Sequence, residues 1–326
     1  MAPKVSVVIA SYNHADHVQA CLRSVLSQDF QDFEIVVTDD GSADATAERV
    51  RELAAQDPRI SLEALPANRG ACIAMNRAIR RARGRYIAVL NSDDVFLPGK
   101  LALQVAWLQA HPEVGATFGW PAFIDERGHR FHDESHKDHA VFKEGNRPRH
   151  AWLRHFFEKG NALCHPTALV RREVYDTVGL YDPRLAQVPD LDMWVRVCSR
   201  YEIHVMQQPL TGFRILEGQR NASAARPEVV VRDAWERAMV LRRYLQLPRR
   251  EIDAAFPEWA GRPDSAAQLL AQHALTLDYP FYQRFALDTL YAELPADDDA
   301  PGLDPQAWRR FIGLTGRTDL HRLYAK

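Results

Sequence analysis

The sequence has little of several features that mark common protein classes. It contains four cysteines in 326 residues and no CxxC pair, which argues against a zinc knuckle or a redox dithiol. No apolar run approaches the roughly 18 residues of a membrane-spanning helix, and the apolar run near the N-terminus is too short for a signal peptide. The 41 basic and 43 acidic residues argue against a protein that coats nucleic acid through a basic surface. We therefore expect a cytoplasmic protein, with peripheral contact at the inner face of a membrane left open.

Two phosphate-binding motifs are also missing. No GxGxxG follows the first predicted strand and no GxxxxGK[ST] occurs, which weakens the interpretation as a dinucleotide-binding or P-loop protein. The composition is otherwise ordinary, with 46% hydrophobic and 26% charged residues. Such a chain can bury a sizeable core. Because both phosphate-binding motifs are missing, any phosphate ligand must be held by other residues.

Strand and helix patterns alternate over the first hundred or so residues. Apolar, largely β-branched runs are typical of strands buried on both faces. The predicted strands are 5–10, 33–38, 60–65, 86–90 and 114–118, and the clearest predicted helices are 70–83 and 98–111. This alternation predicts right-handed βαβ units and a mostly parallel α/β sheet with flanking helices. Gly84 is predicted to end its helix in the left-handed conformation.

The composition changes near Pro227, after which Ala, Leu and Arg dominate. We expect an α/β domain over 1–226 and a helical C-terminal region over 227–326, with an acidic linker at Pro295–Pro305. Trp235, Met239, Leu241 and Tyr244 are expected in the core of the helical region. Three roles stay open for this region: it closes an acceptor cleft, forms an oligomer, or docks on a membrane.

Three polar clusters follow three of the predicted strands: Ser11-Tyr12-Asn13, Asp39-Asp40-Gly41-Ser42 and Asn91-Ser92-Asp93-Asp94. In open parallel sheets, ligands bind outside the carboxyl ends of the strands. One such cluster is usually a simple turn. Three clusters that meet at one edge of the sheet favour a binding site.

Each cluster suits a different part of a nucleotide diphosphate. A ring such as that of Tyr12 can lie against a base, and a carboxylate such as Asp40 can accept the imide N–H of uracil or thymine. Asp93 and Asp94 offer hard oxygen ligands to Mg²⁺ or Mn²⁺, which would bridge the diphosphate oxygens.

These motifs, in this order and spacing, resemble the signature of family 2 glycosyltransferases with the GT-A fold. The resemblance extends over about 4–115 and continues more weakly to about 225; it rests on 5–13, 36–42, 68–70, 76 and 84–94. It implies a Rossmann-like GT-A domain and an inverting transferase that uses a nucleotide-diphospho-sugar, most often a UDP-sugar. The implied acceptor is a glycan, lipid-linked or protein-linked hydroxyl in the biosynthesis of a cell-surface polysaccharide.

The resemblance also assigns residues to the donor pocket. The implied nucleotide-binding residues are Ser11, Tyr12, Asn13, Asp39, Asp40, Asn68, Arg69, Asn76 and Asp93. Asp93 and Asp94 are implied as a pair that contacts the ribose and the divalent metal. Two alternatives stay open: Arg69 as a solvated loop charge, and Asn76 as a cap or a bridge between loops.

The acceptor side is carried by later segments. Residues 189–194 resemble the Glu-Asp-x-Asp-x-Trp motif, whose second position, Asp190 here, provides the catalytic base. A carboxylate suits this role because it is normally ionised at neutral pH and can take the proton of the attacking hydroxyl. The alternative is that Asp190 caps a helix that begins near Asp192. His165 is a candidate contact for the acceptor or a phosphate, with a structural role as its alternative.

Three positions depart from the family pattern. Asn91 stands where the first aspartate is usual, Pro189 stands where a glutamate precedes the base, and Leu216 stands where a histidine is common. In the family that histidine often lies near the diphosphate or the metal, so Leu216 bears on metal dependence. Arg214 and Arg220 are candidates to supply positive charge to phosphate instead.

Two other functions stay open on the sequence alone. A sugar-phosphate nucleotidyltransferase would usually carry a Gly-rich basic loop after its first strand, which 11–14 lacks. A non-catalytic nucleotide-sugar-binding module remains an alternative because of Asn91 and Leu216.

Overall fold

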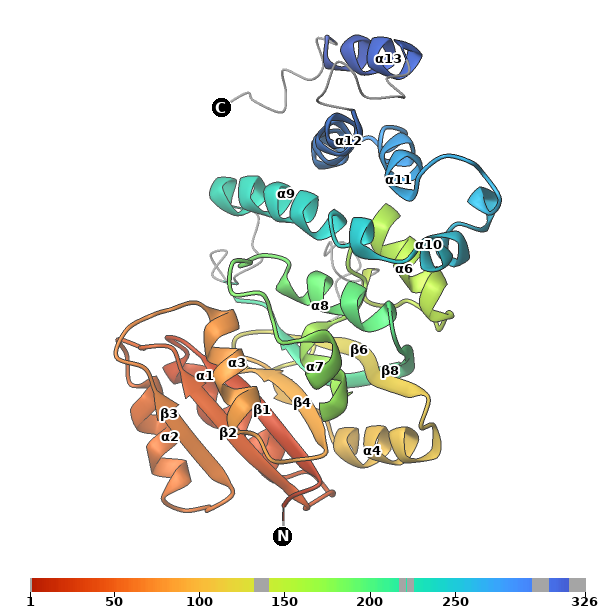
Figure 1. Ribbon diagram of the computed structural model, residues 1–326. Helices are drawn as coiled ribbons and strands as arrows, with labels where there is room; N and C mark the ends of the chain where they lie inside the picture. Colours follow the sequence, from red (N-terminus) through yellow and green to blue (C-terminus); the bar gives the residue numbers. More distant parts are fainter. Residues whose placement is uncertain (1, 132–140, 217–220, 222–225, 295–304, 317–326) are drawn as a thin grey trace.

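The computed structural model describes residues 2–131, 141–216, 221, 226–294 and 305–316 (Figure 1). Its centre is an eight-stranded sheet with the order β3-β2-β1-β4-β7-β6-β8-β5. The strands predicted near the N-terminus are present and mutually parallel: β1 (Val5–Ser11), β2 (Phe33–Asp39), β3 (Ile60–Ala64) and β4 (Tyr86–Asn91). The predicted α/β sheet is therefore confirmed, with the carboxyl ends of β1, β2 and β4 at one edge.

Alternate side chains of each central strand enter two hydrophobic layers. In β1, Val7 and Ile9 join one cluster, whereas Val8 joins the other. The first cluster is completed by α1 (Ala15–Leu26), α2 (Thr46–Ala54) and α4 (Lys100–Ala110), and the second by α3 (Ala71–Arg81) and the later helices. Burial on both faces explains why these strands are continuously apolar.

The second half of the sheet is mixed. It contains β5 (Val95–Phe96), β6 (Val114–Ile124), β7 (Leu169–Arg171) and β8 (Glu202–Arg214). β7 is antiparallel to both β4 and β6, whereas β8 is parallel to β6 and antiparallel to β5. The helices of this half are α6 (Arg149–Glu158), α7 (Arg172–Val178) and α8 (Pro189–Cys198), with a short 3-10 helix at His165–Thr167.

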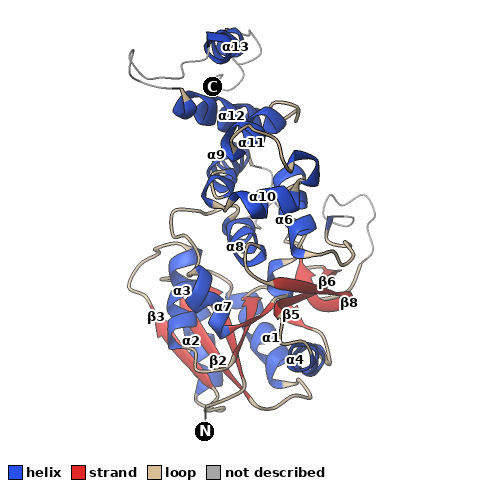
Figure 2. Ribbon diagram, turned by 45° about the vertical axis from the view of Figure 1, so that its right-hand side comes forward, coloured by secondary structure: helices blue, strands red, loops and turns tan. Residues whose placement is uncertain are grey.

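The C-terminal region is helical, as predicted. It contains α9 (Pro227–Leu241), α10 (Arg249–Ala255), α11 (Ala266–Ala274), α12 (Pro280–Glu293) and α13 (Pro305–Thr315). These helices lie beyond α6 and α8, at the end of the molecule away from the N-terminus (Figures 1 and 2). Most of the predicted linker, 295–304, lies outside the described residues.

The C-terminal helices share a hydrophobic cluster with the sheet-bearing part of the chain. Phe157 of α6 contacts the aromatic rings of Tyr244 and Phe285, which come from the C-terminal region. Leu241 and Tyr244 are buried as expected, but Trp235 is 43% exposed, so the prediction that it belongs to the core is wrong. The hydrophobic cluster thus continues across the predicted boundary at 226.

Gly84 corrects another prediction. Helix α3 ends at Arg81, the extended Ala82 follows it, and Gly84 does not adopt a positive φ angle. A Cβ atom at Gly84 would lie 2.5 Å from the backbone nitrogen of Ser6. Glycine is therefore required here because β1 passes close by, a long-range contact that local sequence does not reveal.

A search of the described helices for one long and apolar enough to cross a membrane finds none.

Candidate active site

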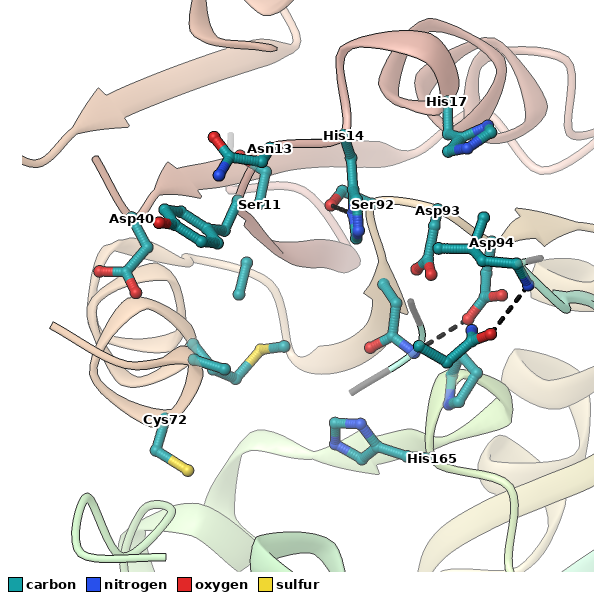
Figure 3. A pocket seen from close by; sticks show the side chains of 18 of the residues that line it. Ser11, Asn13, His14, His17, Asp40, Cys72, Ser92, Asp93, Asp94 and His165 are labelled. Carbon is teal, nitrogen blue, oxygen red and sulfur yellow. Dashed lines mark hydrogen bonds between the residues drawn. The ribbon is translucent and has the colours of Figure 1, made fainter. Parts of the chain in front are cut away.

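A cavity of about 720 Å³ opens at the edge of the sheet where β1 and β4 end (Figure 3). The predicted site residues that line it are Ser11, Tyr12, Asn13, Asp40, Asn68, Asp93, Asp94, His165 and Asp190. Three predicted residues, Asp39, Arg69 and Asn76, are not among the residues that line it. The structure therefore brings together most of a set that spans 180 positions of sequence.

The loops after β1 and β2 are held together by hydrogen bonds of Asp39 and Asn13. Asp39 accepts from the Ser11 hydroxyl at 3.0 Å and from the Ser42 backbone N–H at 2.9 Å. Asn13 has a positive φ of 52°, and its side-chain oxygen accepts from the Ala43 backbone N–H at 2.9 Å. Asp39 and Asn13 thus support the loops and leave the Tyr12 ring 43% exposed at the cavity.

Asp40 holds the backbone of the loop that precedes α3. Its two carboxylate oxygens accept from the backbone N–H groups of Arg69 and Gly70, each at 2.8 Å. The Arg69 side chain is exposed and is not part of the cavity lining, so its contribution to the site is its backbone. Asp40 is 2% exposed and lines the cavity, and each of its oxygens keeps a lone pair that could accept from a base N–H.

Asn76 lies behind the cavity and bridges two segments. Its amide nitrogen donates to the Tyr181 carbonyl at 2.8 Å, and its oxygen accepts from the Tyr181 N–H at 3.0 Å. Tyr181 lines the cavity, and its hydroxyl is 2.8 Å from Nε2 of His165. The structure thus matches the alternative in which Asn76 joins two segments of chain.

The Asp93–Asp94 pair has one buried and one partly exposed member. Asp94 is 1% exposed, and its oxygens accept from the side-chain amide of Asn91 at 2.9 Å and from the backbone N–H of Arg214 at 2.8 Å. Burial, together with the charge of Asp93, raises the pKa of Asp94 well above its usual value. An aspartate at position 91 would set a second carboxylate against Asp94, so the amide replaces a repulsion with a hydrogen bond.

The guanidinium of Arg214 forms hydrogen bonds with backbone carbonyls. It donates to the carbonyls of Asp93 at 2.6 Å, Asp125 at 2.7 Å and Glu126 at 2.8 Å. The side chain is therefore used to hold the loop that carries the aspartate pair. Arg220, the other predicted phosphate partner, lies outside the described residues.

The carboxylates fit a divalent metal that is shared with a substrate. Among the described residues, no group of three or more His, Cys, Asp or Glu side chains could hold a metal ion. Mg²⁺ is commonly held by one or two carboxylates together with substrate phosphates and water, and Asp93 and Asp94 provide such a pair on the cavity wall.

Two histidines at this end of the cavity were not predicted. His14 and His17, both in the cavity lining, lie at the start of α1 (Figure 3). Nδ1 of His14 is 2.7 Å from the Ser92 hydroxyl, while burial and the charge of Arg214 lower the pKa of His17. The sequence signal that could have indicated them is that both histidines closely follow Ser11-Tyr12-Asn13 and lie three positions apart, which on a helix places them on one face.

Asp190 lies in the first turn of α8, which begins at Pro189 rather than near Asp192. Its carboxylate accepts from the Asn161 side-chain amide at 2.7 Å and from the Leu191 N–H at 2.8 Å. Burial raises the pKa of Asp190 to about 6. This carboxylate is thus ionised at neutral pH and holds a proton more readily than a solvated aspartate.

Asp192, in the first turn of the same helix, supports α8 through ion pairs. It is buried and forms ion pairs with Arg196 at 2.7 Å and Arg243 at 2.6 Å, so it ties α8 to the segment that follows α9.

His165 is held in the cavity wall as a neutral ring. Burial lowers its pKa to about 4, so the imidazole carries no charge at neutral pH. The turn that carries it is anchored by Lys100, whose ammonium donates to Gln104 at 2.6 Å and to the Thr167 carbonyl at 3.1 Å. This buried lysine was not anticipated from the sequence.

The sheet and its flanking helices match solved GT-A glycosyltransferase structures, so the chain has the GT-A fold. The family model described as glycosyl transferase family 2 matches residues 6–179, which is more than half of the chain. The chain therefore belongs to glycosyl transferase family 2, and the predicted family is confirmed.

One relative and two solved structures are similar to this chain. An uncharacterized glycosyltransferase of Methanocaldococcus jannaschii is 30% identical over 219 residues, which cover 65% of this chain and 71% of that protein. The crystal structure of S. aureus TarS in complex with UDP-GlcNAc has a TM-score of 0.62 at 19% identity, covering 89% of this chain and 81% of that one. The mannosyltransferase PcManGT of Pyrobaculum calidifontis, in complex with GDP-Man and Mn²⁺, has a TM-score of 0.56 at 19% identity, covering 99% and 83%.

Proposed function

We propose that this glycosyltransferase moves a sugar, with inversion, from a UDP-sugar to a hydroxyl of a glycan, lipid-linked or protein-linked acceptor. One observation carries the proposal. Tyr12, Asp40 and the Asp93–Asp94 pair line the same cavity as Asp190. The residues suited to hold a nucleotide diphosphate and the carboxylate suited to take a proton therefore line one cavity.

Asp190 is the proposed general base. The acceptor hydroxyl attacks the anomeric carbon from the face opposite the diphosphate, and Asp190 removes its proton as the new bond forms. A pKa of about 6 suits this role, because the carboxylate is ionised at pH 7 yet still basic enough to accept the proton. Attack from the opposite face in a single displacement inverts the anomeric configuration.

Asp93 and Asp94 are proposed to hold a divalent metal, Mn²⁺ or Mg²⁺, against the donor. Such a metal neutralises the charge that develops on the leaving diphosphate. Asn91 and Arg214 orient Asp94 for this task through the hydrogen bonds to its two oxygens. The Mn²⁺ in the PcManGT complex supports the proposal in general terms.

The choice of a UDP-sugar rests on Asp40 and on one similar structure. Asp40 lies in the cavity wall with capacity to accept the imide N–H of uracil, and the S. aureus TarS structure contains UDP-GlcNAc. We propose a role in the synthesis of a cell-surface polysaccharide, carried out in the cytoplasm or at the inner face of the membrane. Cys21, Cys72 and Cys198 are buried free thiols, which suits a reducing compartment.

A panel of nucleotide sugars tests the donor. UDP-N-acetylglucosamine, UDP-glucose, dTDP-glucose and GDP-mannose are each added with and without Mn²⁺, and the melting temperature is measured. A bound donor stabilises the folded state by RT ln(1 + [L]/Kd), so the UDP-sugars are expected to raise the melting temperature most, and only with Mn²⁺. A larger rise with GDP-mannose would contradict the proposed donor.

The pH dependence of the reaction tests Asp190 through its neighbour. The base acts when ionised, so kcat/KM for nucleotide release is expected to fall as the pH drops through about 6. The Asn161 amide donates to the carboxylate and favours its ionised form. Asn161→Ala is therefore expected to raise this pKa and move the acid limb to higher pH by about one unit, since a hydrogen bond to a charged group contributes about 1.5 kcal/mol or more.

The control is Asn68→Ala, which removes an amide that lines the same cavity, in the loop whose Arg69 N–H donates to Asp40. It is expected to leave the acid limb in place. An acid limb that does not move in Asn161→Ala would show that Asp190 is not the group that titrates.

A further inference from the structure

The loop that leads into α8 depends on a carboxylate from the C-terminal region. The backbone N–H groups of Ala186, Gln187 and Val188 all point to Glu236 of α9, at distances of 2.8, 2.7 and 3.0 Å. Glu236 is 1% exposed. One oxygen accepts from Ala186 and the other accepts from both Gln187 and Val188, so the carboxylate fills a concave group of N–H donors of the kind that binds anions.

This loop needs an external acceptor. The N–H groups of Ala186, Gln187 and Val188 precede Pro189, the first residue of α8, so no carbonyl within the helix accepts from them. The loop also forms part of the cavity wall, because Ala186, Gln187, Pro189 and Asp190 all line it. Glu236 therefore fixes the backbone immediately before the residue proposed as the base.

Helix α9 also reaches the other side of Asp190. Arg237, the next residue, approaches Gly160 so closely that a Cβ atom there would collide with its guanidinium. Gly160 precedes Asn161, the side chain that donates to Asp190. The positive charge of Arg237 lowers the pKa of Asp190. The negative charge of Asp233, which forms an ion pair with Arg237, raises the pKa of Asp190. Two consecutive residues of α9 thus contact the two chain segments that hold Asp190.

We propose that Glu236 is a positioning residue for Asp190, so that helix α9 of the C-terminal region is part of the catalytic unit. This inference rests on the proposed role of Asp190 as general base. A base must lie within hydrogen-bond reach of the hydroxyl that it deprotonates, and displacement by about 1 Å can cost about 10²-fold in rate. Glu236 sets this position through the three N–H groups, without itself facing the substrate.

Glu236→Gln is the direct test in the full-length chain. The glutamine keeps one acceptor oxygen but turns an NH₂ group toward the N–H donors, so the loop must shift. We expect kcat for nucleotide release from UDP-N-acetylglucosamine to fall about 10- to 100-fold. The KM for the donor is expected to change less than threefold, because Tyr12, Asp40 and Asp93 are carried by other elements. The matched control is Glu228→Gln, on the first turn of the same helix, whose side chain is 61% exposed and which is expected to keep wild-type kcat.

Three outcomes would overturn the proposal. The first is a Glu236→Gln protein with wild-type kcat, and the second is one in which donor KM rises as much as kcat falls. Glu236→Asp, which keeps the charge on a shorter side chain, carries the test if the glutamine variant does not fold. The third outcome is that neither variant shows a UDP-dependent rise in melting temperature. Glu236 would then stabilise the whole chain rather than position the loop. A wild-type chain that releases no nucleotide would instead count against the proposed function.

Discussion

Replacing Asp190 by asparagine is expected to lower the rate of nucleotide release about 10²- to 10⁴-fold, the range of general-base catalysis. Asparagine has nearly the same shape, so Asn161 and Leu191 can still contact position 190. The amide cannot accept a proton from the acceptor hydroxyl at neutral pH. Steady-state rates of UDP release, with donor affinity from the nucleotide-dependent melting temperature, measure the two effects separately.

The matched control for this variant is Asp176→Asn. Asp176 lies on the exposed face of α7 and outside the cavity, so the variant removes the same charge without touching the site. Wild-type rates are expected from it. If Asp190→Asn keeps a rate within threefold of wild type while it binds UDP normally, another group must take the proton.

Replacing Asp94 by asparagine is expected to abolish the Mn²⁺ dependence of donor binding and to lower kcat/KM at least about 10³-fold. One of the two carboxylates at this end of the cavity is lost, and charge stabilisation by a bound metal contributes several kcal/mol to such reactions. Titration calorimetry of UDP with and without Mn²⁺ measures the first effect, and the rate of UDP release measures the second.

The interpretation of this variant depends on the burial of Asp94. Asparagine can still accept from Arg214 or from Asn91 through its one oxygen, so the loop is expected to keep its conformation. Far-UV circular dichroism and the melting temperature without ligand check this point, again beside Asp176→Asn. An Asp94→Asn protein in which Mn²⁺ still strengthens UDP binding tenfold or more would contradict the assignment of Asp94 to the metal.

The parallel half of the sheet could be predicted because its information is local. Each of the strands β1, β2 and β4 is a short apolar run that ends in a polar cluster, and parallel strands necessarily bring these ends to one edge. The cavity-lining role of Tyr12, Asp40 and Asp93 follows from this rule together with the family motif. The same reasoning places Asp190 only through the motif, since nothing local shows that α8 faces the strand ends.

The expectations that failed concern contacts between distant residues. Gly84 is glycine because Ser6 passes beside it, not because a helix ends there. Trp235 is expected in the core but is 43% exposed, whereas Glu236, the next residue on α9, is buried. Hydrophobicity and spacing describe one element at a time, so they cannot identify which elements meet.

The sequence by itself therefore determined the class of this protein, its α/β order and the strand ends that carry Tyr12, Asp40 and the Asp93–Asp94 pair. Only the tertiary structure decided how Asp190 is held. Its carboxylate depends on Asn161, and its loop depends on Glu236, 46 residues after Asp190 and beyond the predicted domain boundary. The physical reason is that the three backbone N–H groups of the loop before α8 need an acceptor, and a buried carboxylate that folding brings near can provide it.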